Sequence, residues 1–174
     1  MMTGLFAALA IVAAVPSGAA TPIEGYGAIA PLAGDETRPD PKLRYRIVFS
    51  VTKGASEPKM VNPSLDRAAR FWNLLAREGV QPHRGDIVIV ISGPATDAAL
   101  TSSAYAVRFG GLANPNLPLI EKFRAAGITV AVCAQALQGQ AIPHASVAQG
   151  VRIDVSAITT LAMLQLQGWA LISD

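Results

Sequence analysis

Cys133 is the only cysteine in this 174-residue chain, and it is the residue type best suited to covalent chemistry. It ends the apolar run 127–132, which predicts a buried strand, and it precedes 134–137, which predicts a turn into a short helix. The thiol is therefore expected at the carboxyl end of a strand, beside a helix amino terminus. Ligands gather at that edge of parallel α/β sheets, and a helix amino terminus favours thiolate over thiol.

Two other polar clusters are expected at the same edge, at 92–96 after the apolar run 87–91 and at 154–156 after a short strand. Because the carboxyl ends of parallel strands share one edge, these loops and 133–135 are expected to line a common crevice. The candidate substrate-binding residues are Gly93, Thr96, Ala134, Gln135 and Ser156. The simpler interpretation is that Thr96 and Ser156 only cap helices, as Ser and Thr commonly do.

Other chemistries find no support in the sequence. No glycine-rich phosphate loop follows a strand, and the two histidines, His83 and His144, stand in loop-like contexts without metal-ligand spacing. Neither a metal ion nor a cofactor is therefore expected. The formal net charge of +2 is small and scattered, so no nucleic-acid partner is expected.

Residues 1–20 resemble a secretory signal. The run from Leu5 to Val15 is uninterrupted and apolar, and the small residues Gly18-Ala19-Ala20 predict cleavage after Ala20. The alternative is an uncleaved anchor, but the run is shorter than the roughly 20 residues that span a bilayer, and no other segment is long enough. The mature protein is therefore expected to be periplasmic or secreted, without an integral membrane domain.

The expected export limits the roles that the single thiol can have. Oxidising compartments favour disulfides, and a single cysteine cannot form one within its own chain. Cys133 is therefore buried and inert, paired with another chain, or kept as a reactive thiol.

The remaining sequence divides into an arm and a domain. Residues 21–42 are rich in proline and glycine and predict an extended or poorly ordered arm, which could also wrap a neighbouring subunit. Residues 43–174 alternate strand and helix patterns, with strands expected near 44–52, 86–92, 127–133, 151–155 and 169–172. Helices are expected to begin after the caps Ser64, Thr96, Asn116 and Ser156. This alternation predicts an α/β fold with a parallel sheet and helices on both faces.

The last predicted helix, 157–167, has almost no polar face. A helix that is apolar all round is buried on all sides. In a domain of this size part of that surface is expected to meet another subunit, and the alternative is burial between the sheet and neighbouring helices alone.

Several motifs between Arg46 and Trp169 resemble the DsrE/DsrF-like family, which includes the TusD-type sulfur-relay subunits. The most specific is Cys133-Ala134-Gln135-Ala136-Leu137 in its strand context. The weaker ones are Val51-Thr52, Ala69-Arg70-Phe71-Trp72-Asn73-Leu74-Leu75, Gly93-Pro94-Ala95-Thr96, Asn114-Pro115-Asn116 and Leu164-Gln165-Leu166-Gln167-Gly168-Trp169.

The resemblance implies a three-layer α/β/α fold with a mostly parallel sheet of about five strands, assembled as a homotrimer or homohexamer. It implies that Cys133 accepts sulfur as a persulfide from a donor protein and passes it to an acceptor. The chain departs from the relay members in its expected export and in Gln138-Gly139-Gln140, where they often carry Arg-Gly. The alternative function is a non-catalytic module that binds a small ligand or a partner, with Cys133 as core packing.

Overall fold

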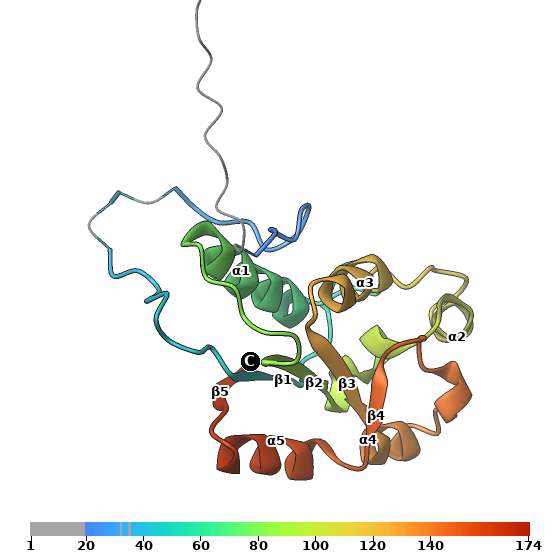
Figure 1. Cartoon of the computed structure of the whole chain (residues 1–174). Helices are drawn as coiled ribbons and strands as arrows, with labels where there is room; N and C mark the ends of the chain where they lie inside the picture. Colours follow the sequence, from blue (N-terminus) through green and yellow to red (C-terminus); the bar gives the residue numbers. More distant parts are fainter. Residues whose placement is uncertain (1–19, 32, 35) are drawn as a thin grey trace, which may run out of the picture.

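The computed structural model describes residues 20–31, 33–34 and 36–174. The expected signal segment 1–20 therefore lies outside the described residues, apart from Ala20. Residues 43–174 contain all the helices and strands of the described chain (Figure 1).

Five strands form one parallel sheet in the order β4-β3-β2-β1-β5. They are β1 (Ile47–Val51), β2 (Ile87–Ile91), β3 (Thr129–Cys133), β4 (Arg152–Asp154) and β5 (Ala170–Ser173). The β2 segment Ile-Val-Ile-Val-Ile is buried at every position, as expected of an internal strand covered on both faces. The chain adds β1 to β4 in sequence and then crosses back to place β5 beside β1.

Helices cover both faces of this sheet. The α-helices are α1 (Pro63–Arg77), α2 (Ser102–Arg108), α3 (Leu117–Ala125), α4 (Ala134–Gly139) and α5 (Ala157–Leu166), and the 3-10 helices are η1 (Gly93–Ala99) and η2 (His144–Ser146). Figure 1 shows α1 and α3 on one face and α5 on the opposite face, with α4 beside α5. The predicted three-layer α/β fold with a five-stranded parallel sheet is confirmed.

The two faces of the sheet bury two unequal cores. The larger core lies beneath α1 and α3 and includes the fully buried Leu65, Ile89 and Phe123. The smaller core lies beneath α5 and contains Val48, Val88, Val90, Cys133 and Ala157. Successive strand residues point to opposite faces, so Val90 and Ile89 belong to different cores.

Two of the predicted helix starts are wrong. The cap of α1 is Asn62, whose Oδ1 accepts hydrogen bonds from the backbone N–H groups of Ser64 and Leu65, so Ser64 lies inside the helix. Thr96 begins no helix either. It lies within η1, where its hydroxyl donates to the carbonyl of Gly93.

Asn116 and Ser156 precede α3 and α5 as predicted, but neither side chain makes a capping hydrogen bond. The Asn116 side chain instead accepts from the backbone N–H of Asn62 at 2.7 Å and donates to Asn114. It therefore ties two loops together. No helix was predicted to begin between Thr96 and Asn116, yet Ser102–Arg108 forms α2, and its start is capped by the Thr101 hydroxyl.

Residues 21–28 of the predicted arm lie along α1 of the same chain. Asn73 holds this segment by accepting from the N–H of Ile23 at 2.7 Å and donating to the carbonyl of Tyr26 at 2.9 Å. Gly27 packs so closely on α1 that an added Cβ would overlap the backbone of Arg70. The polar stripe of α1, formed by Asp66, Arg70 and Asn73, thus binds the main chain of the arm.

Candidate functional site

Cys133 lies where the sequence predicts, as the last residue of β3 and the residue that precedes α4. The backbone of Cys133 is extended, and the helix begins at the next residue. β3 is an internal strand between β2 and β4, so the thiol stands among the carboxyl ends of three neighbouring strands.

The Cys133 residue is nevertheless only 5% exposed. It belongs to the smaller core with Val90 and Ala157, and Ala136 and Leu161 pack against that core. The first turn of α5 therefore covers the sheet face on which the thiol lies. A reagent that reaches the sulfur must enter beside α4 or α5, or displace one of these helices.

The polar neighbour of Cys133 in the sheet is Asp154, its register partner on β4. The Asp154 carboxylate accepts two hydrogen bonds from the Arg152 guanidinium, at 2.6 and 2.9 Å, and a third from the Thr160 hydroxyl. The hydrogen bonds to Asp154 raise the pKa of Arg152 above its usual value. This triad anchors α5 to β4, close to the thiol.

The predicted residues of the 92–96 loop lie at the same edge but are largely engaged internally. Gly93 adopts a positive φ of 54°, and its carbonyl accepts from both the Thr96 hydroxyl at 2.7 Å and the Gln140 side chain at 2.8 Å. Thr96 is fully buried. The second of these bonds links η1 to the residue that follows α4.

The other predicted residues differ in exposure. Gln135 is exposed on α4, whereas Ala134 and Ser156 are half-buried. The Ser156 carbonyl accepts from the Thr159 hydroxyl at 3.0 Å. Gln135 is therefore the predicted binding residue whose side chain is most open to solvent.

The predicted crevice takes a different form in the structure. A cleft of about 200 Å³ lies at this edge, between the β1–α1 loop, η1 and α2. Its lining includes Pro94 and Ala95 from the predicted 92–96 loop, but none of residues 133–135 or 154–156. Instead it contains Asp97 and Tyr105, two titratable residues not identified from the sequence.

Asp97 and Tyr105 both have perturbed acidities. Burial raises the pKa of Asp97, and the nearby Arg108 guanidinium offsets that effect only in part. Burial and the Asp97 charge together raise the pKa of Tyr105. The sequence signal that could have located Tyr105 is the Thr101 cap, which predicts a helix over the following residues.

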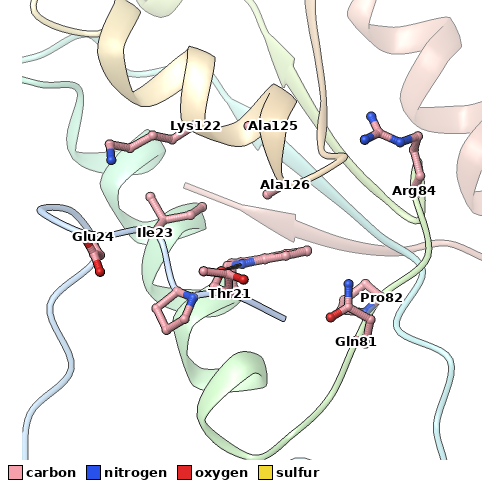
Figure 2. A pocket seen from close by; sticks show the side chains of 11 residues that line it. Thr21, Ile23, Glu24, Gln81, Pro82, Arg84, Lys122, Ala125 and Ala126 are labelled. Carbon is pink, nitrogen blue, oxygen red and sulfur yellow. Dashed lines mark hydrogen bonds between the residues drawn. The ribbon is translucent and has the colours of Figure 1, made fainter. Parts of the chain in front are cut away.

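A larger cleft of about 610 Å³ lies elsewhere, between the arm, α1, α3 and the α1–β2 loop (Figure 2). Parallel strands begin at that end of the sheet, so this cleft is remote from the loop that carries Cys133. Figure 2 shows Lys122 and Arg84 on opposite sides of the cleft, with Ile23 and Ala126 between them. The charged groups of this cleft do not converge on one point.

Within the described residues, no group of three or more His, Cys, Asp and Glu side chains is arranged to hold a metal ion. In the same part of the chain, no helix has the length and apolar character needed to cross a membrane.

The structure is a parallel α/β protein with one cysteine at the end of a strand. Comparisons with known proteins identify its family. Residues 44–173 match the model of the DsrE/DsrF-like family. The chain therefore belongs to this family. No curated protein sequence matches it.

Two solved structures share the fold. One is the protein of unknown function MTH1491 from Methanobacterium thermoautotrophicum, at 19% identity and a TM-score of 0.54. The other is the YchN protein from E. coli, at 18% identity and the same TM-score. Each alignment covers 75% of this chain and 99% of the other chain. At this level of identity the similarity establishes the fold alone.

Proposed function

We propose that this protein is a sulfur carrier that holds sulfane sulfur as a persulfide on Cys133. The observation that carries the proposal is the position of Cys133, where β3 ends and α4 begins, in a chain that belongs to the DsrE/DsrF-like family. It is also the only cysteine in the chain, so an accepted sulfur atom has no second thiol to reach within the same subunit.

The transfer is a thiol–persulfide exchange. The Cys133 thiolate attacks the terminal sulfur of a donor persulfide, R–S–SH, so that one S–S bond forms while the donor's S–S bond breaks. The products are Cys133–S–SH and the donor thiolate R–S⁻, with no net oxidation. An acceptor thiolate then removes the terminal sulfur by the same exchange, which regenerates the Cys133 thiolate.

The burial of Cys133 sets a condition on this chemistry. Because the sulfur lies in a core that contains Ala157 of α5 and is packed by Leu161 and by Ala136 of α4, exchange requires local opening of this core. In many proteins the free energy of such local opening is well below that of global unfolding. We expect the folded protein to react with a small thiol reagent more slowly than free cysteine, but at a rate that does not follow global unfolding.

Mass spectrometry tests the carrier function directly. The intact protein is incubated with glutathione persulfide and is expected to gain the mass of one sulfur atom, which dithiothreitol removes. Cys133→Ser is the matched control and is expected to gain nothing. Absence of the adduct on a protein whose thiol reacts with iodoacetamide would refute the proposal.

A second candidate function is favoured by the apolar surroundings of the thiol. In that case Cys133 is core packing, and the protein is a module that binds a ligand or partner. A thiol that reacts only after denaturation, together with a lower free energy of unfolding in Cys133→Ala, would support this function over sulfur transfer.

Self-association is part of the proposal. Ile158 and Leu166 on α5 are 78% and 89% exposed, and Met163 lies exposed on the same helix. Several large apolar side chains exposed on one helix commonly mark a protein interface. We propose a homotrimer or homohexamer that buries this face, to be measured by sedimentation equilibrium. A monomer at micromolar concentration would contradict it.

We further propose that the mature protein is periplasmic or secreted. The support is the sequence pattern of residues 1–20. Cell fractionation and amino-terminal sequencing of the full-length product test this proposal, and retention of residues 1–20 on a cytoplasmic protein would refute it.

A further inference from the structure

The amino end of α5 belongs to the small core that buries Cys133, and few contacts hold it there. We propose that the hydrogen bond from the Thr160 hydroxyl to Asp154 is a latch that keeps this end of α5 on the sheet. When the latch opens, the first turns of α5 fray and the Cys133 thiol is exposed to a donor or acceptor of sulfur. The proposal rests on the carrier function proposed above and names the device that regulates it.

The latch lies beside the thiol. Cys133 and Asp154 are register partners on the parallel strands β3 and β4, and register partners point to the same face of a sheet. Thr160 reaches Asp154 from α5 with a hydrogen bond of 2.9 Å, so the face that Cys133 and Asp154 share is the one that α5 covers. A change in this contact therefore acts where the sulfur is buried.

The acceptor of the latch is held in a fixed position. The Arg152 guanidinium donates two hydrogen bonds to the Asp154 carboxylate, at 2.6 and 2.9 Å. Thr160 is 6% exposed, and Ala157 is the only other buried residue of α5. Hydrogen bonds to charged groups are stronger than those between neutral groups. The Thr160 hydroxyl therefore makes a large contribution to the attachment of a helix that buries little else.

The rest of the amino end of α5 is weakly held. The Ser156 side chain makes no capping hydrogen bond, and the first turn contains no acidic residue, so the two usual stabilising features of a helix amino terminus are missing. Within the described part of the chain, the bond from Thr160 to Asp154 is the only side-chain hydrogen bond between α5 and a strand. Loss of this bond leaves the first turns without a polar attachment to the sheet.

The opposite end of α5 is fixed by several contacts. The Arg46 guanidinium donates to the carbonyl of Gln167 at 3.1 Å and lies 4.8 Å from the centre of the Trp169 ring. The Trp169 indole N–H donates to the carbonyl of Asp86 at 3.0 Å. Opening is therefore expected at the amino end of α5, next to Cys133, while the carboxyl end stays in place.

Alkylation of the folded full chain tests the latch, at iodoacetamide concentrations where the rate is first order in the reagent. Thr160→Val removes the hydroxyl, keeps the size of the side chain and leaves every charge near the thiol in place. We expect it to raise the alkylation rate of Cys133 about tenfold, since it removes a hydrogen bond to a carboxylate. Thr160→Ser keeps the donor and is expected to react within about twofold of the parent protein. An unchanged rate in Thr160→Val would overturn the proposal.

A matched control separates the latch from a general loss of stability. Ile120→Val removes one methylene from the larger core, on the opposite face of the sheet. Both Ile120→Val and Thr160→Val are expected to unfold at lower urea concentration than the parent protein. Only Thr160→Val is expected to alkylate faster, because the larger core stays intact while α5 frays. Equal increases in both variants would show that the thiol reacts through global unfolding and would overturn the proposal.

Hydrogen exchange of the parent chain gives a test that needs no variant and decides if Thr160→Val fails to fold. The amide of Leu161 is expected to exchange at least about tenfold faster than that of Leu164, because local opening exchanges only the amides that it frees. Equal protection of the two amides would overturn the proposal.

Glutathione persulfide distinguishes failure of the latch from failure of the carrier function. A faster gain of one sulfur atom in Thr160→Val than in the parent protein supports both. Faster alkylation of Thr160→Val without any sulfur adduct supports the latch and refutes the carrier function. Sulfur adducts that form at the same rate in the two proteins refute the latch and support the carrier function.

Discussion

The two helical layers of this protein bury the sheet in different ways. On one face, α1 and α3 enclose the larger core, and the outer polar stripe of α1 is itself covered by residues 21–28. On the other face, α5 covers a small core that contains Cys133, while its own outer surface remains apolar and exposed. The first layer is completed by the chain's own arm, and the second leaves an apolar surface that we propose another subunit covers.

The same contrast separates the two candidate sites. The Asp97 cleft lies among loops that are joined by hydrogen bonds of buried asparagines. Cys133 lies beneath α5 in an apolar setting, so its chemistry depends on how readily α5 moves. A buried thiol of this kind is reached only when a partner or a local opening exposes it.

The largest expected difference between the layers is in stability. Phe123→Ala in the larger core is expected to lower the free energy of unfolding by about 3–5 kcal/mol, because a fully buried ring leaves a cavity. Leu166→Ala, on the exposed face of α5, is expected to change it by less than about 0.5 kcal/mol. Chemical denaturation of both variants at a protein concentration that keeps them monomeric measures the difference. Similar losses would mean that the layers are equally packed.

The next largest change in the free energy of unfolding is expected where α1 holds the arm. Asn73→Ala removes hydrogen bonds to the backbone of Ile23, Tyr26 and Gly27 and is expected to cost about 1–3 kcal/mol, since buried main-chain groups lose their partners. Faster amide exchange confined to residues 21–28 should accompany the loss. The matched control is Arg77→Ala, an exposed residue of the same helix. Unchanged exchange in Asn73→Ala would show that the arm is held by other contacts.

Asp174 tests how the β5 edge is held. Burial alone would raise its pKa, but hydrogen bonds from the backbone N–H of Lys53 and from the Thr52 and Ser64 groups outweigh it and lower the pKa to about 2. A carboxylate whose pKa is lower in the folded state stabilises the fold above the unfolded value near 3.8 and loses that effect as the pH falls towards 2.

The corresponding variant is Asp174→Asn. We expect it to lose about 1 kcal/mol at neutral pH, a figure reduced for solvent screening, and to differ little from the parent protein near pH 2. Thermal unfolding followed across pH 2–7 measures the difference. A gap between the two proteins that is constant with pH would show that the loss comes from packing and is unrelated to ionisation.

The smallest effect on the monomer is expected from Leu166→Glu. A charge on an exposed helix position changes stability by less than about 0.5 kcal/mol, yet it should prevent the proposed association through α5. Sedimentation velocity compares it with Glu121→Lys, which changes an exposed charge on α3. Association that survives Leu166→Glu would place the subunit interface elsewhere.

The strands were predictable because their signal is local. The run Ile-Val-Ile-Val-Ile of β2 and the apolar run before Cys133 are β-branched and continuous, as strands buried on both faces require. The position of Cys133 follows from the same signal. Its burial does not, because the covering helix α5 begins more than twenty residues later in the chain.

The helix starts were less predictable because several polar residues compete at each loop. Ser64 is an acceptable cap by residue type, but Asn62 takes that position, and the Ser64 hydroxyl donates to Asp174 at the far end of the chain. Thr96 similarly bonds within η1. The choice among candidates depends on neighbours that the local sequence does not contain.

The sequence by itself was enough to determine a parallel α/β sheet with the lone thiol at a strand end. The reason is that the spacing of apolar residues within each short segment distinguishes strands from helices. Tertiary structure alone decided that α5 covers the thiol, that the arm lies on α1, and that Asp97 and Tyr105 share a cleft with Asn62. Those arrangements join segments distant in sequence, and their energies arise from burial and charge that exist only after the chain has folded.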